Sequence, residues 1–483
     1  MSTEHPVEHL DVLIIGAGLS GIGAACQLRE RQPRRTVAVL ESREVSGGTW
    51  DLFRYPGIRS DSDMYTFGYR WRPWRNERAL ADGDAILDYL RQVAGEYGVD
   101  RLIRYRHRVV GASWDSDTAR WTVRSQTPDG EVTLTASFLW NCGGYYDYDQ
   151  GYTPQFPGLD DFRGQVIHPQ HWPEDLDYTG KRVVVIGSGA TAVTLVPAMV
   201  AGGAGHVTML QRSPTYVLSM PGKDPLAQRL ERLPEKVRYP ILRWKSILVS
   251  VGLYQLSRWK PDVLRGFIRK NTIRQLPPEV DVDVHFKPTY DPWDQRLCLV
   301  PDGDLFRALR KGSASVVTDT IETFTDTGIR LTSGEELEAD IIVTATGLQL
   351  LALNAPLEVD GRPVELPETM AYKAMMLSGI PNFAFTIGYT NASWTLKADL
   401  VSDYVCRLLD HLDRHGLRTA TPRPDPTVGQ RPLMDFSAGY VLRALDELPK
   451  QGDRAPWQLK QNYLTDVRKI RRDPIDDGVL TFA

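Results

Sequence analysis

A glycine-rich turn between a short apolar strand and a helix occurs twice in this chain, and this repeat constrains the fold more than any other feature. In the first copy a strand at 11–15 leads into Gly16-Ala17-Gly18-Leu19-Ser20-Gly21, and a helix then extends to residue 31. Gly16 permits the tight turn, Gly18 lets a pyrophosphate approach the backbone, and Gly21 lets the helix pack closely on the strand. The free N–H groups at the start of that helix favour an anion. The first copy therefore predicts a dinucleotide-binding unit.

An acidic residue at the end of the next strand refines this prediction. We expect a strand at 36–40, and Glu41 follows it, twenty residues after Gly21. A carboxylate at this spacing can accept hydrogen bonds from a ribose 2′-hydroxyl. We interpret the first unit as an FAD site. Its predicted binding residues are Gly16, Gly18, Gly21 and Glu41.

The second copy differs at the end of its second strand. A strand at 182–186 precedes Gly187-Ser188-Gly189-Ala190-Thr191-Ala192, with alanine in the place of the third glycine. Gln211 stands where the first unit has its acid, and Arg212 follows it. Loss of the anion and gain of a guanidinium suit a 2′-phosphate, because Arg can bind it through two hydrogen bonds. We interpret this unit as an NADPH site, the alternative being that Arg212 is an ordinary surface charge. The predicted binding residues are Gly187, Gly189, Ala192, Arg212 and Ser213.

The length and two further patterns predict the domain organisation. A chain of 483 residues should form two or three domains. Strand-and-glycine patterns at 138–144 and 340–347 look like closing strands of nucleotide-binding sheets. We therefore expect an α/β fold with two Rossmann-like domains, the second inserted in the first. The FAD domain would be discontinuous and comprise 1–145 and 336–483, and the NADPH domain would comprise 146–335.

Composition and charge exclude several classes of protein. With 42% apolar residues, 24% charged residues and a net charge of −4, neither disorder nor a nucleic-acid partner is expected. The four cysteines form no C-x-x-C pair and no zinc-ligand spacing, so we expect no metal site and a reducing compartment. No apolar run approaches the roughly 20 residues that cross a membrane, and nothing in the first ten residues is typical of a signal peptide. A cytoplasmic protein is predicted.

A helical insertion at about 221–277 has a different character. Between 221 and 275 there are thirteen Lys or Arg and four acids, a balance of +9 that leaves −13 for the rest of the chain. Arg243-Trp244-Lys245 and Arg258-Trp259-Lys260 bracket an apolar run, which suits an anionic membrane surface and peripheral association. The alternative, which we favour, is an insertion that covers the substrate entrance or a subunit contact, with its basic face solvated.

The segment between the two glycine units carries a longer motif. It reads FRGQVIHPQHWP and matches F-x-G-x-x-x-H-x-x-x-W-P/D at every defined position. With this motif the chain resembles the Baeyer-Villiger monooxygenases, which are class B flavoprotein monooxygenases; the Trp-Pro ending separates it from the related flavin-containing monooxygenases. The resemblance covers essentially the whole chain and is closest to the ethionamide-activating group, notably at 48–64, 168–178 and 394–401. The motif positions are Phe162, Gly164, His168, Trp172 and Pro173.

The resemblance implies an activity and roles for further residues. Such enzymes use NADPH to reduce their FAD and then insert one oxygen atom of O2 into a ketone, giving an ester or lactone. Some also oxygenate sulfur in thioamides or thioethers. Arg296 would be the fixed cation that keeps the reacting oxygen negative, with Asp61 orienting it. His168 would serve the hinge between domains rather than proton transfer. Cofactor contacts are also implied for Gly48, Thr49, Trp50 and Asp61.

Several alternatives stay open at this point. Arg296 and Asp61 could form a plain interdomain salt bridge. The chain could be a flavin-containing monooxygenase that oxygenates nitrogen or sulfur, or a non-oxygenating NADPH-flavin redox protein. A disulfide reductase is disfavoured, because Cys26 has no partner before Cys142. Gln295 replaces a lysine that many relatives carry before the catalytic arginine, so Arg212 would have to supply more of the preference for NADPH.

Overall fold

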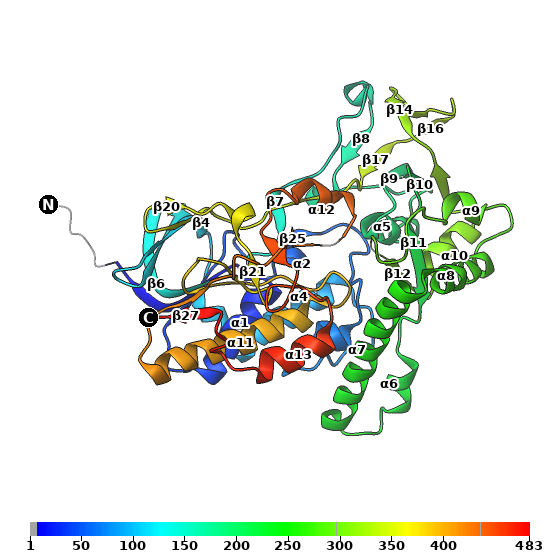
Figure 1. Ribbon diagram of the computed structural model, residues 1–483. Coiled ribbons are helices and arrows are strands. Elements are labelled where there is room, and N and C mark those ends of the chain that lie inside the picture. The colour runs from blue at the N-terminus through cyan, green and yellow to red at the C-terminus, as the bar shows by residue number, and fades with distance from the viewer. Residues whose placement is uncertain (1–6, 296, 435) are drawn as a thin grey trace.

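The computed structural model describes residues 7–295, 297–434 and 436–483. Within these ranges the first glycine unit belongs to a nine-stranded sheet of order β20-β19-β4-β5-β6-β1-β2-β3, with β23 also paired to β6 (Figure 1). β1, β2, β6 and β23 are parallel, whereas β4, β5 and β6 form an antiparallel meander. The strands are β1 (His9–Ile15), β2 (Val37–Leu40), β3 (Ile103–Arg104), β4 (Arg108–Asp115), β5 (Arg120–Thr127), β6 (Gly130–Asn141), β19 (Leu357–Val359), β20 (Arg362–Pro363) and β23 (Phe383–Phe385).

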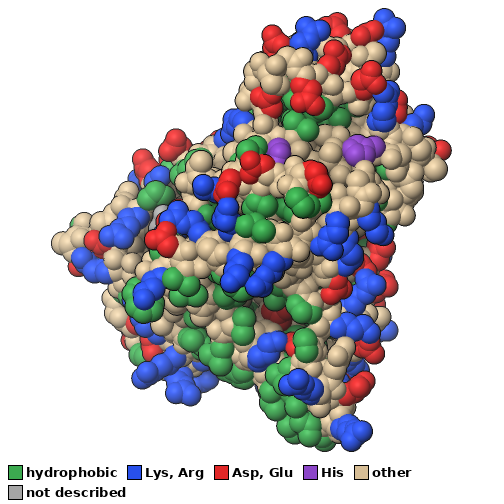
Figure 2. Space-filling view, turned by 90° about the vertical axis from the view of Figure 1, so that its right-hand side faces the viewer, with side chains coloured by type: hydrophobic (Ala, Val, Ile, Leu, Met, Phe, Trp, Pro, Cys, Tyr) green, Lys and Arg blue, Asp and Glu red, His purple; other side chains and the backbone are tan. Residues whose placement is uncertain are grey.

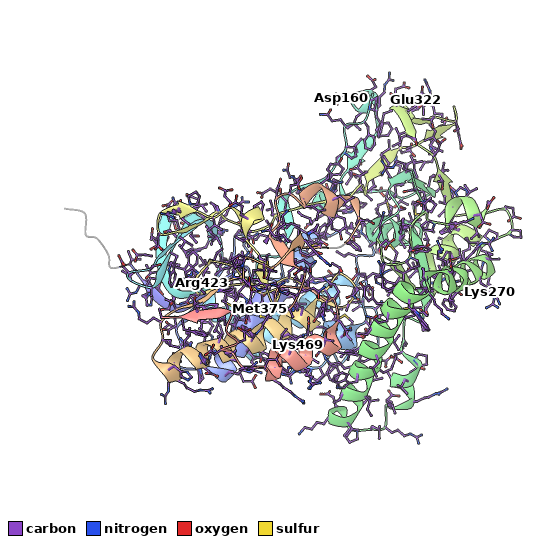
Figure 3. The ribbon with its side chains drawn as sticks, viewed as in Figure 1. Asp160, Lys270, Glu322, Met375, Arg423 and Lys469 are labelled. Atoms are coloured by element: carbon purple, nitrogen blue, oxygen red, sulfur yellow. The ribbon has the colours of Figure 1, made fainter. Side chains whose placement is uncertain are left out.

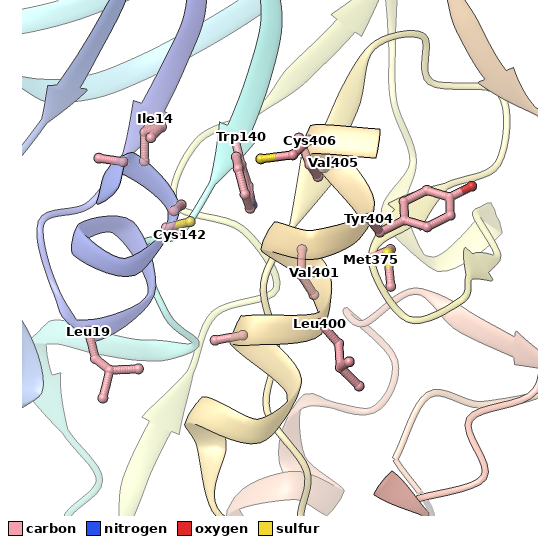
Figure 4. Close-up of a cluster of buried hydrophobic side chains, with 14 of the residues drawn as sticks. Ile14, Leu19, Trp140, Cys142, Met375, Leu400, Val401, Tyr404, Val405 and Cys406 are labelled. Carbon is pink, nitrogen blue, oxygen red and sulfur yellow. The ribbon is translucent and has the colours of Figure 1, made fainter. Parts of the chain in front are cut away.

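The strand β1 is apolar throughout because both of its faces are covered. Val12 and Ile14 pack into a cluster with the helices on one side, and Leu13 packs into a second cluster on the other side. Figure 4 shows part of the first cluster, in which Ile14 and Trp140 lie with Val401 and Val405 of the long helix α11. Burial on both faces is the reason that a parallel strand reads as a continuous apolar run. The covering helices are α1 (Leu19–Arg31), α4 (Gly83–Glu96), α11 (Trp394–His415) and α13 (Tyr463–Arg472).

The second glycine unit belongs to a separate five-stranded sheet of order β13-β10-β9-β17-β8, all parallel. The two sheets with their helices form two α/β domains, and together with the helical insertion they confirm the expected fold class. An antiparallel sheet of β14, β15 and β16 extends beyond it. The elements are β8 (Gln165–Ile167), β9 (Arg182–Ile186), α5 (Ala190–Ala201), β10 (His206–Gln211), α10 (Asp304–Arg310), β13 (Ala314–Thr318), β14 (Ile321–Phe324), β15 (Gly328–Leu331), β16 (Glu336–Glu338) and β17 (Ile341–Thr344).

The position of β17 differs from our expectation. We predicted that the inserted domain ends at 335, yet β17 pairs with β8 and β9 and thus belongs to the second sheet. A strand followed by glycine can close either sheet, and the pattern at 340–347 does not distinguish them. The chain returns to the first domain only through β18 (Leu348–Leu350), which pairs with the outgoing segment β7 (Tyr146–Gly151). These two antiparallel segments connect the domains.

The helical insertion leaves and rejoins the second domain through two paired strands. β11 (Tyr216–Met220) and β12 (Leu297–Pro301) are parallel neighbours, and the helices lie between them in the chain. In Figure 1 the longest of these, α7, runs obliquely away from the second domain along the side of the first. Its Arg243 reaches the first domain, where the guanidinium donates to the carbonyl oxygens of Tyr65 and Gly68, both at 2.7 Å. The helices are α6 (Pro225–Arg229), α7 (Glu235–Trp259), α8 (Pro261–Gln275) and α9 (Val282–His285).

Short elements complete the fold. Buried Met375 lies inside the first domain, whereas charged side chains such as Lys270 and Lys469 point outward from the helices (Figure 3). Among the described residues, no helix is both long and apolar enough to span a membrane. The remaining elements are α2 (Thr49–Leu52), α3 (Met64–Phe67), β21 (Ala371–Tyr372), β22 (Met376–Leu377), β24 (Ala420–Pro422), β25 (Gln430–Pro432), α12 (Gly439–Ala444), β26 (Lys450–Gly452), β27 (Leu480–Phe482) and short 3-10 turns at Asp100–Leu102, Leu159–Asp161, Pro169–His171 and Leu366–Glu368.

Candidate active site

A cavity of about 1190 Å³ lies between the two domains and reaches from the first glycine turn to the second. Gly16 and Gly18 line one part of it, and Gly187 and Gly189 line another. Side chains of α7 and of the strands β11 and β12 form a third wall. The fold therefore brings both predicted dinucleotide sites to one continuous space, at the edge where the parallel strands end, which is where ligands bind in such sheets.

In both glycine turns the first glycine has a positive φ and the second starts a helix with an ordinary φ. Gly16 and Gly187 have φ of +94° and +137°, which favour glycine, and a Cβ on Gly16 would lie 2.8 Å from the carbonyl oxygen of Cys142. Gly18 and Gly189 start α1 and α5 with ordinary φ of −82° and −77°. A Cβ on Gly18 would meet no atom closer than 3.5 Å, and one on Gly189 none within 4 Å. The open space before each helix N-terminus fits a pyrophosphate.

The third position of each turn packs the helix against its strand. A Cβ on Gly21 would lie 1.8 Å from the carbonyl oxygen of Gly16, so no larger residue fits there. Ala192, which takes this place in the second turn, is the third residue of α5 and is fully buried. Gly21 and Ala192 therefore set the spacing between helix and turn rather than facing the cavity.

Glu41 occupies the position predicted for a ribose-binding acid. The side chain is buried and lines the cavity at the end of β2. One of its carboxylate oxygens accepts a hydrogen bond of 2.8 Å from the backbone N–H of Ala17, and the other accepts one of 2.9 Å from that of Arg43. A carboxylate has lone pairs beyond these two bonds. Glu41 is thus fixed in orientation and retains acceptor capacity toward the cavity.

The segment from Gly48 to Trp50 closes over the first turn. Gly48 approaches Gly18 so closely that a Cβ on it would lie 3.0 Å from the Gly18 Cα. Thr49 shares a 3.2 Å hydrogen bond with the Tyr148 hydroxyl, and burial raises the pKa of Tyr148 to about 12. Trp50 packs edge-on against Phe67 at 5.5 Å. Tyr148, which our sequence analysis missed, comes from the strand β7 that links the domains, so this lid over the first turn is tied to the linker.

The predicted catalytic pair can be placed only in part. Asp61 is exposed and lines the cavity. Arg296 lies outside the described residues, but Gln295 and Leu297 on either side of it line the same cavity. Nearby Trp293 also lines it, with φ of +70°, a conformation uncommon for a bulky side chain. Backbone strain of this kind tends to occur at functional sites. The structure thus brings Asp61 to the same space as the segment that we predicted to carry catalysis.

An ion pair that the sequence did not reveal crosses between the domains close to Asp61. The guanidinium of Arg59 donates to the carboxylate of Asp304, the first residue of α10, at 2.5 Å. Burial raises the pKa of Tyr55 to about 12, and the charge of Asp61 contributes to this increase. The loop that carries Asp61 is therefore held against the second domain. No local pattern marks Arg59 or Asp304 as partners, because they are far apart in the chain.

The residues predicted to bind the 2′-phosphate lie at the end of β10. Gln211 is buried, and its amide donates to the carbonyl oxygen of His285 and to the hydroxyl of Thr318. Arg212 and Ser213 are exposed and line the cavity. Gln211 thus has a structural role, and the polar surface offered to a ligand comes from Arg212 and Ser213.

The fingerprint residues do not line the cavity. Phe162 is buried beside Phe324, and Gly164 passes close to the carbonyl oxygen of Asp340. The imidazole Nε2 of His168 donates to the carbonyl oxygen of Gly347 at 3.3 Å, and burial lowers the pKa of His168. Trp172 packs against the second-domain core, and Pro173 is exposed. His168 bridges the start of the second sheet to the returning linker, as a hinge role would require.

Known proteins with similar sequences identify the family. A model of the flavin-binding monooxygenase-like family matches residues 77–227, and a model of the NAD(P)-binding Rossmann-like domain matches residues 14–78. The FAD-containing monooxygenase EthA of Mycobacterium tuberculosis is 59% identical over 479 residues, which are 99% of this chain and 98% of that protein. The chain belongs to the family of FAD-containing monooxygenases. EthA of Mycolicibacterium smegmatis, another FAD-containing monooxygenase, is 56% identical over 479 residues, 99% of this chain and 97% of that protein.

Solved structures agree with the fold of this FAD-containing monooxygenase. A steroid monooxygenase bound to NADP has a TM-score of 0.72 at 26% identity, covering 86% of this chain and 88% of that chain. An open form of cyclohexanone monooxygenase has a TM-score of 0.71 at 21% identity, covering 86% and 90%, and supports the fold alone. The expected class is confirmed: the chain is a flavoprotein monooxygenase that uses FAD and NADPH.

Proposed function

We propose that this FAD-containing monooxygenase inserts one oxygen atom of O2 into ketones to form esters or lactones. The reaction balances as ketone, O2, NADPH and a proton giving ester, NADP⁺ and water. The observation that carries the proposal is the common cavity, which both glycine turns, Asp61 and the residues beside 296 line together. Sulfur in thioamides and thioethers is the second class of acceptor that we propose.

Two sets of residues would hold the cofactors. In the proposal Gly16, Gly18 and Glu41 bind the pyrophosphate and ribose of FAD, with Gly48, Thr49 and Trp50 closing over them. Gly187, Gly189, Arg212 and Ser213 bind NADPH. The bound cofactors supply reducing power and oxygen activation. The fold supports this assignment because each glycine turn opens on the cavity with room in front of a helix N-terminus.

Charged side chains would then control the reacting oxygen. Arg296 stabilises negative charge on that oxygen, which keeps it nucleophilic toward the ketone carbon. Asp61 orients the guanidinium through its carboxylate. Excluding water strengthens this interaction. The apolar wall that would exclude it consists of Leu218, Met220, Val249, Leu253, Trp293, Leu297 and Leu299.

The proposed organisation keeps the flavin domain discontinuous, with the inserted domain lengthened to include β17. The fingerprint residues Phe162, Gly164, His168, Trp172 and Pro173 set the hinge between these domains. We also propose peripheral contact with a membrane through residues 221–275. The proposed activity is compatible with an oligomeric enzyme. It involves no nucleic-acid partner.

Oxygen consumption and product analysis test this function. Purified enzyme with NADPH should consume O2 in proportion to ester formed from a panel of linear, cyclic and aryl ketones, with thioethers and a thioamide compared in parallel. Arg296→Ala should lower ester formation by about a hundredfold or more, as loss of one charge-stabilising donor does. Anaerobic reduction of the flavin by NADPH should stay near the parent rate. Normal ester yield from Arg296→Ala, or peroxide as the sole product of the parent with every acceptor, would contradict the proposal.

A further inference from the structure

The helix α7 exposes an apolar stripe along its length. Its members are between 42% and 75% exposed. At about 100° per residue they lie within about 60° of the helix circumference. The opposite side of α7, which includes Tyr239, Ser246 and Ser257, is buried against the protein. The α7 stripe, as we call it, consists of Val237, Ile241, Trp244, Leu248 and Trp259.

Basic residues border the α7 stripe on both sides. By the same helical geometry Lys236 and Arg258 lie along one edge, and Arg238 and Lys245 lie along the other. Lys245 and Arg258 also form ion pairs with Asp224 and Asp294. In Figure 2 hydrophobic side chains gather at the lower tip of the molecule, where α6 and the start of α7 lie, and Lys and Arg side chains surround them. An apolar face with cationic edges is typical of helices that lie in a membrane interface.

The charge distribution favours an anionic lipid surface over a second copy of the chain. The segment at 221–275 carries +9 and the rest of the chain −13, so the positive charge is concentrated on this lobe. A two-fold symmetric dimer through the α7 stripe would bring this positive lobe against itself. An anionic bilayer offers both opposite charge for the edges and an apolar interior for the stripe.

The same helix forms part of the cavity wall. Lys245, Val249 and Leu253 of α7 line the cavity. Val249 is 45% exposed and lies next to the basic edge formed by Arg238 and Lys245, outside the α7 stripe. The edge of the cavity therefore borders the basic edge of the membrane-suited face. We propose that the α7 stripe docks on an anionic membrane surface, so that apolar substrates dissolved in the bilayer enter the cavity beside α7. The substrate part of this inference rests on the proposed oxygenation, whereas the docking does not.

Vesicle sedimentation tests the docking. The parent holoenzyme should sediment with phosphatidylglycerol vesicles and about tenfold less with phosphatidylcholine vesicles, and added salt should weaken the first interaction. The double variant Ile241→Glu with Leu248→Glu should lose about tenfold in affinity for the anionic vesicles. A matched control, Val110→Glu with Val132→Glu, adds the same charge at exposed positions of the first-domain sheet and should bind like the parent. Flavin absorbance checks that each variant is folded.

Three results would overturn the proposed docking. The first is a parent that sediments with neither kind of vesicle or equally with both. The second is a stripe variant that binds like the parent, and the third is a control variant that loses as much affinity as the stripe variant. Concentration-dependent self-association that only the stripe variant loses, without vesicle binding by the parent, would assign the face to a second copy and also overturn it.

A comparison of two ketones tests the entry route separately. An apolar ketone dissolved in phosphatidylglycerol vesicles should be turned over about fivefold more slowly by the stripe variant than by the parent, while a short water-soluble ketone should be turned over equally. Equal turnover of the vesicle-borne ketone would overturn the route. If the parent oxygenates neither ketone, the proposed function fails, and vesicle sedimentation still decides the docking.

Discussion

Gly18 and Gly189 occupy the same position in the two turns, and both have ordinary φ values with open space in front of them. A valine fits the backbone at either position and fills the space that a pyrophosphate needs. We expect Gly18→Val to fold but to purify with little or no yellow flavin. Gly189→Val should stay yellow, with anaerobic reduction by NADPH slowed at least about tenfold and reduction by dithionite unchanged. Absorbance spectra and stopped-flow kinetics measure both effects. Parent-like flavin content in Gly18→Val would refute the assignment of the first turn.

The choice between NADPH and NADH is a second question at the level of one side chain. Arg212 is exposed at the end of β10 and lines the cavity, while Gln211 beside it is tied to His285 and Thr318. Arg212→Ala should raise the KM for NADPH about tenfold, or about 1.4 kcal/mol of binding, because the 2′-phosphate loses a charged partner. The KM for NADH should change little. Steady-state kinetics with both coenzymes check this, with Arg163→Ala as an exposed control; equal changes for both coenzymes would exclude a 2′-phosphate role.

Among the elements, α7 depends on one buried cation for its attachment to the first domain. The Arg243 guanidinium donates to carbonyl oxygens at the end of α3 and, at 3.3 Å, to Asp399 of α11. Burial raises the pKa of Asp399, and the charge of Arg243 opposes that increase. Arg243→Met would remove the donor to the Tyr65 and Gly68 carbonyls. It would also leave the buried Asp399 carboxylate without its guanidinium, with the backbone N–H of Arg70 still donating to it. We expect the free energy of unfolding to fall by about 3–5 kcal/mol. Denaturant titration measures this, and Arg238→Met, on the outer part of the same helix, should cost far less.

The same helix shows what a single sequence can and cannot reveal. The periodic apolar strands and glycine turns predicted β1, α1, β9 and α5 closely, because those signals are local. The sequence grouped Arg243 with the solvated basic residues of the insertion, yet its side chain points inward while neighbouring Trp244 points outward. Whether a basic residue in a helix is buried depends on what packs against it, here the end of α3. For the same reason the sequence did not show which sheet the strand at 340–347 joins, and the structure pairs β17 with β8 and β9.

In the candidate site too, local signals predict the positions of some residues, while the positions of others depend on packing. The positions of Gly18 and Gly189 could be predicted because each lies in a glycine turn before a helix, and that of Glu41 because it directly follows β2. Tyr148 and the pair Arg59 and Asp304 could not, because their positions depend on how the two domains meet. Asp61 was predicted through a resemblance alone, and only the fold brings it to the cavity.

At the scale of the whole molecule, the two domains meet around the cavity and are joined by paired linkers and by the ion pair of Arg59 with Asp304. The α7 helix adds a third connection, because it belongs to the insertion of the second domain and packs on the first domain through Arg243. A ligand in the cavity contacts structure from all of these parts. Cofactor binding should therefore affect the stability of the whole chain and not only that of one turn.

Removal of FAD tests this coupling. A ligand that binds only the folded chain stabilises it by about 2.7 kcal/mol at a hundredfold excess over its Kd. The apoprotein should therefore melt several degrees below the holoenzyme in calorimetry, and added FAD should restore the midpoint. NADP⁺ alone should raise the apoprotein midpoint less than FAD does, because the buried core around β1 and α1 surrounds the first turn. Gly18→Val should not respond to FAD. If the apoprotein and holoenzyme melt together, the first turn does not hold a cofactor that the fold depends on.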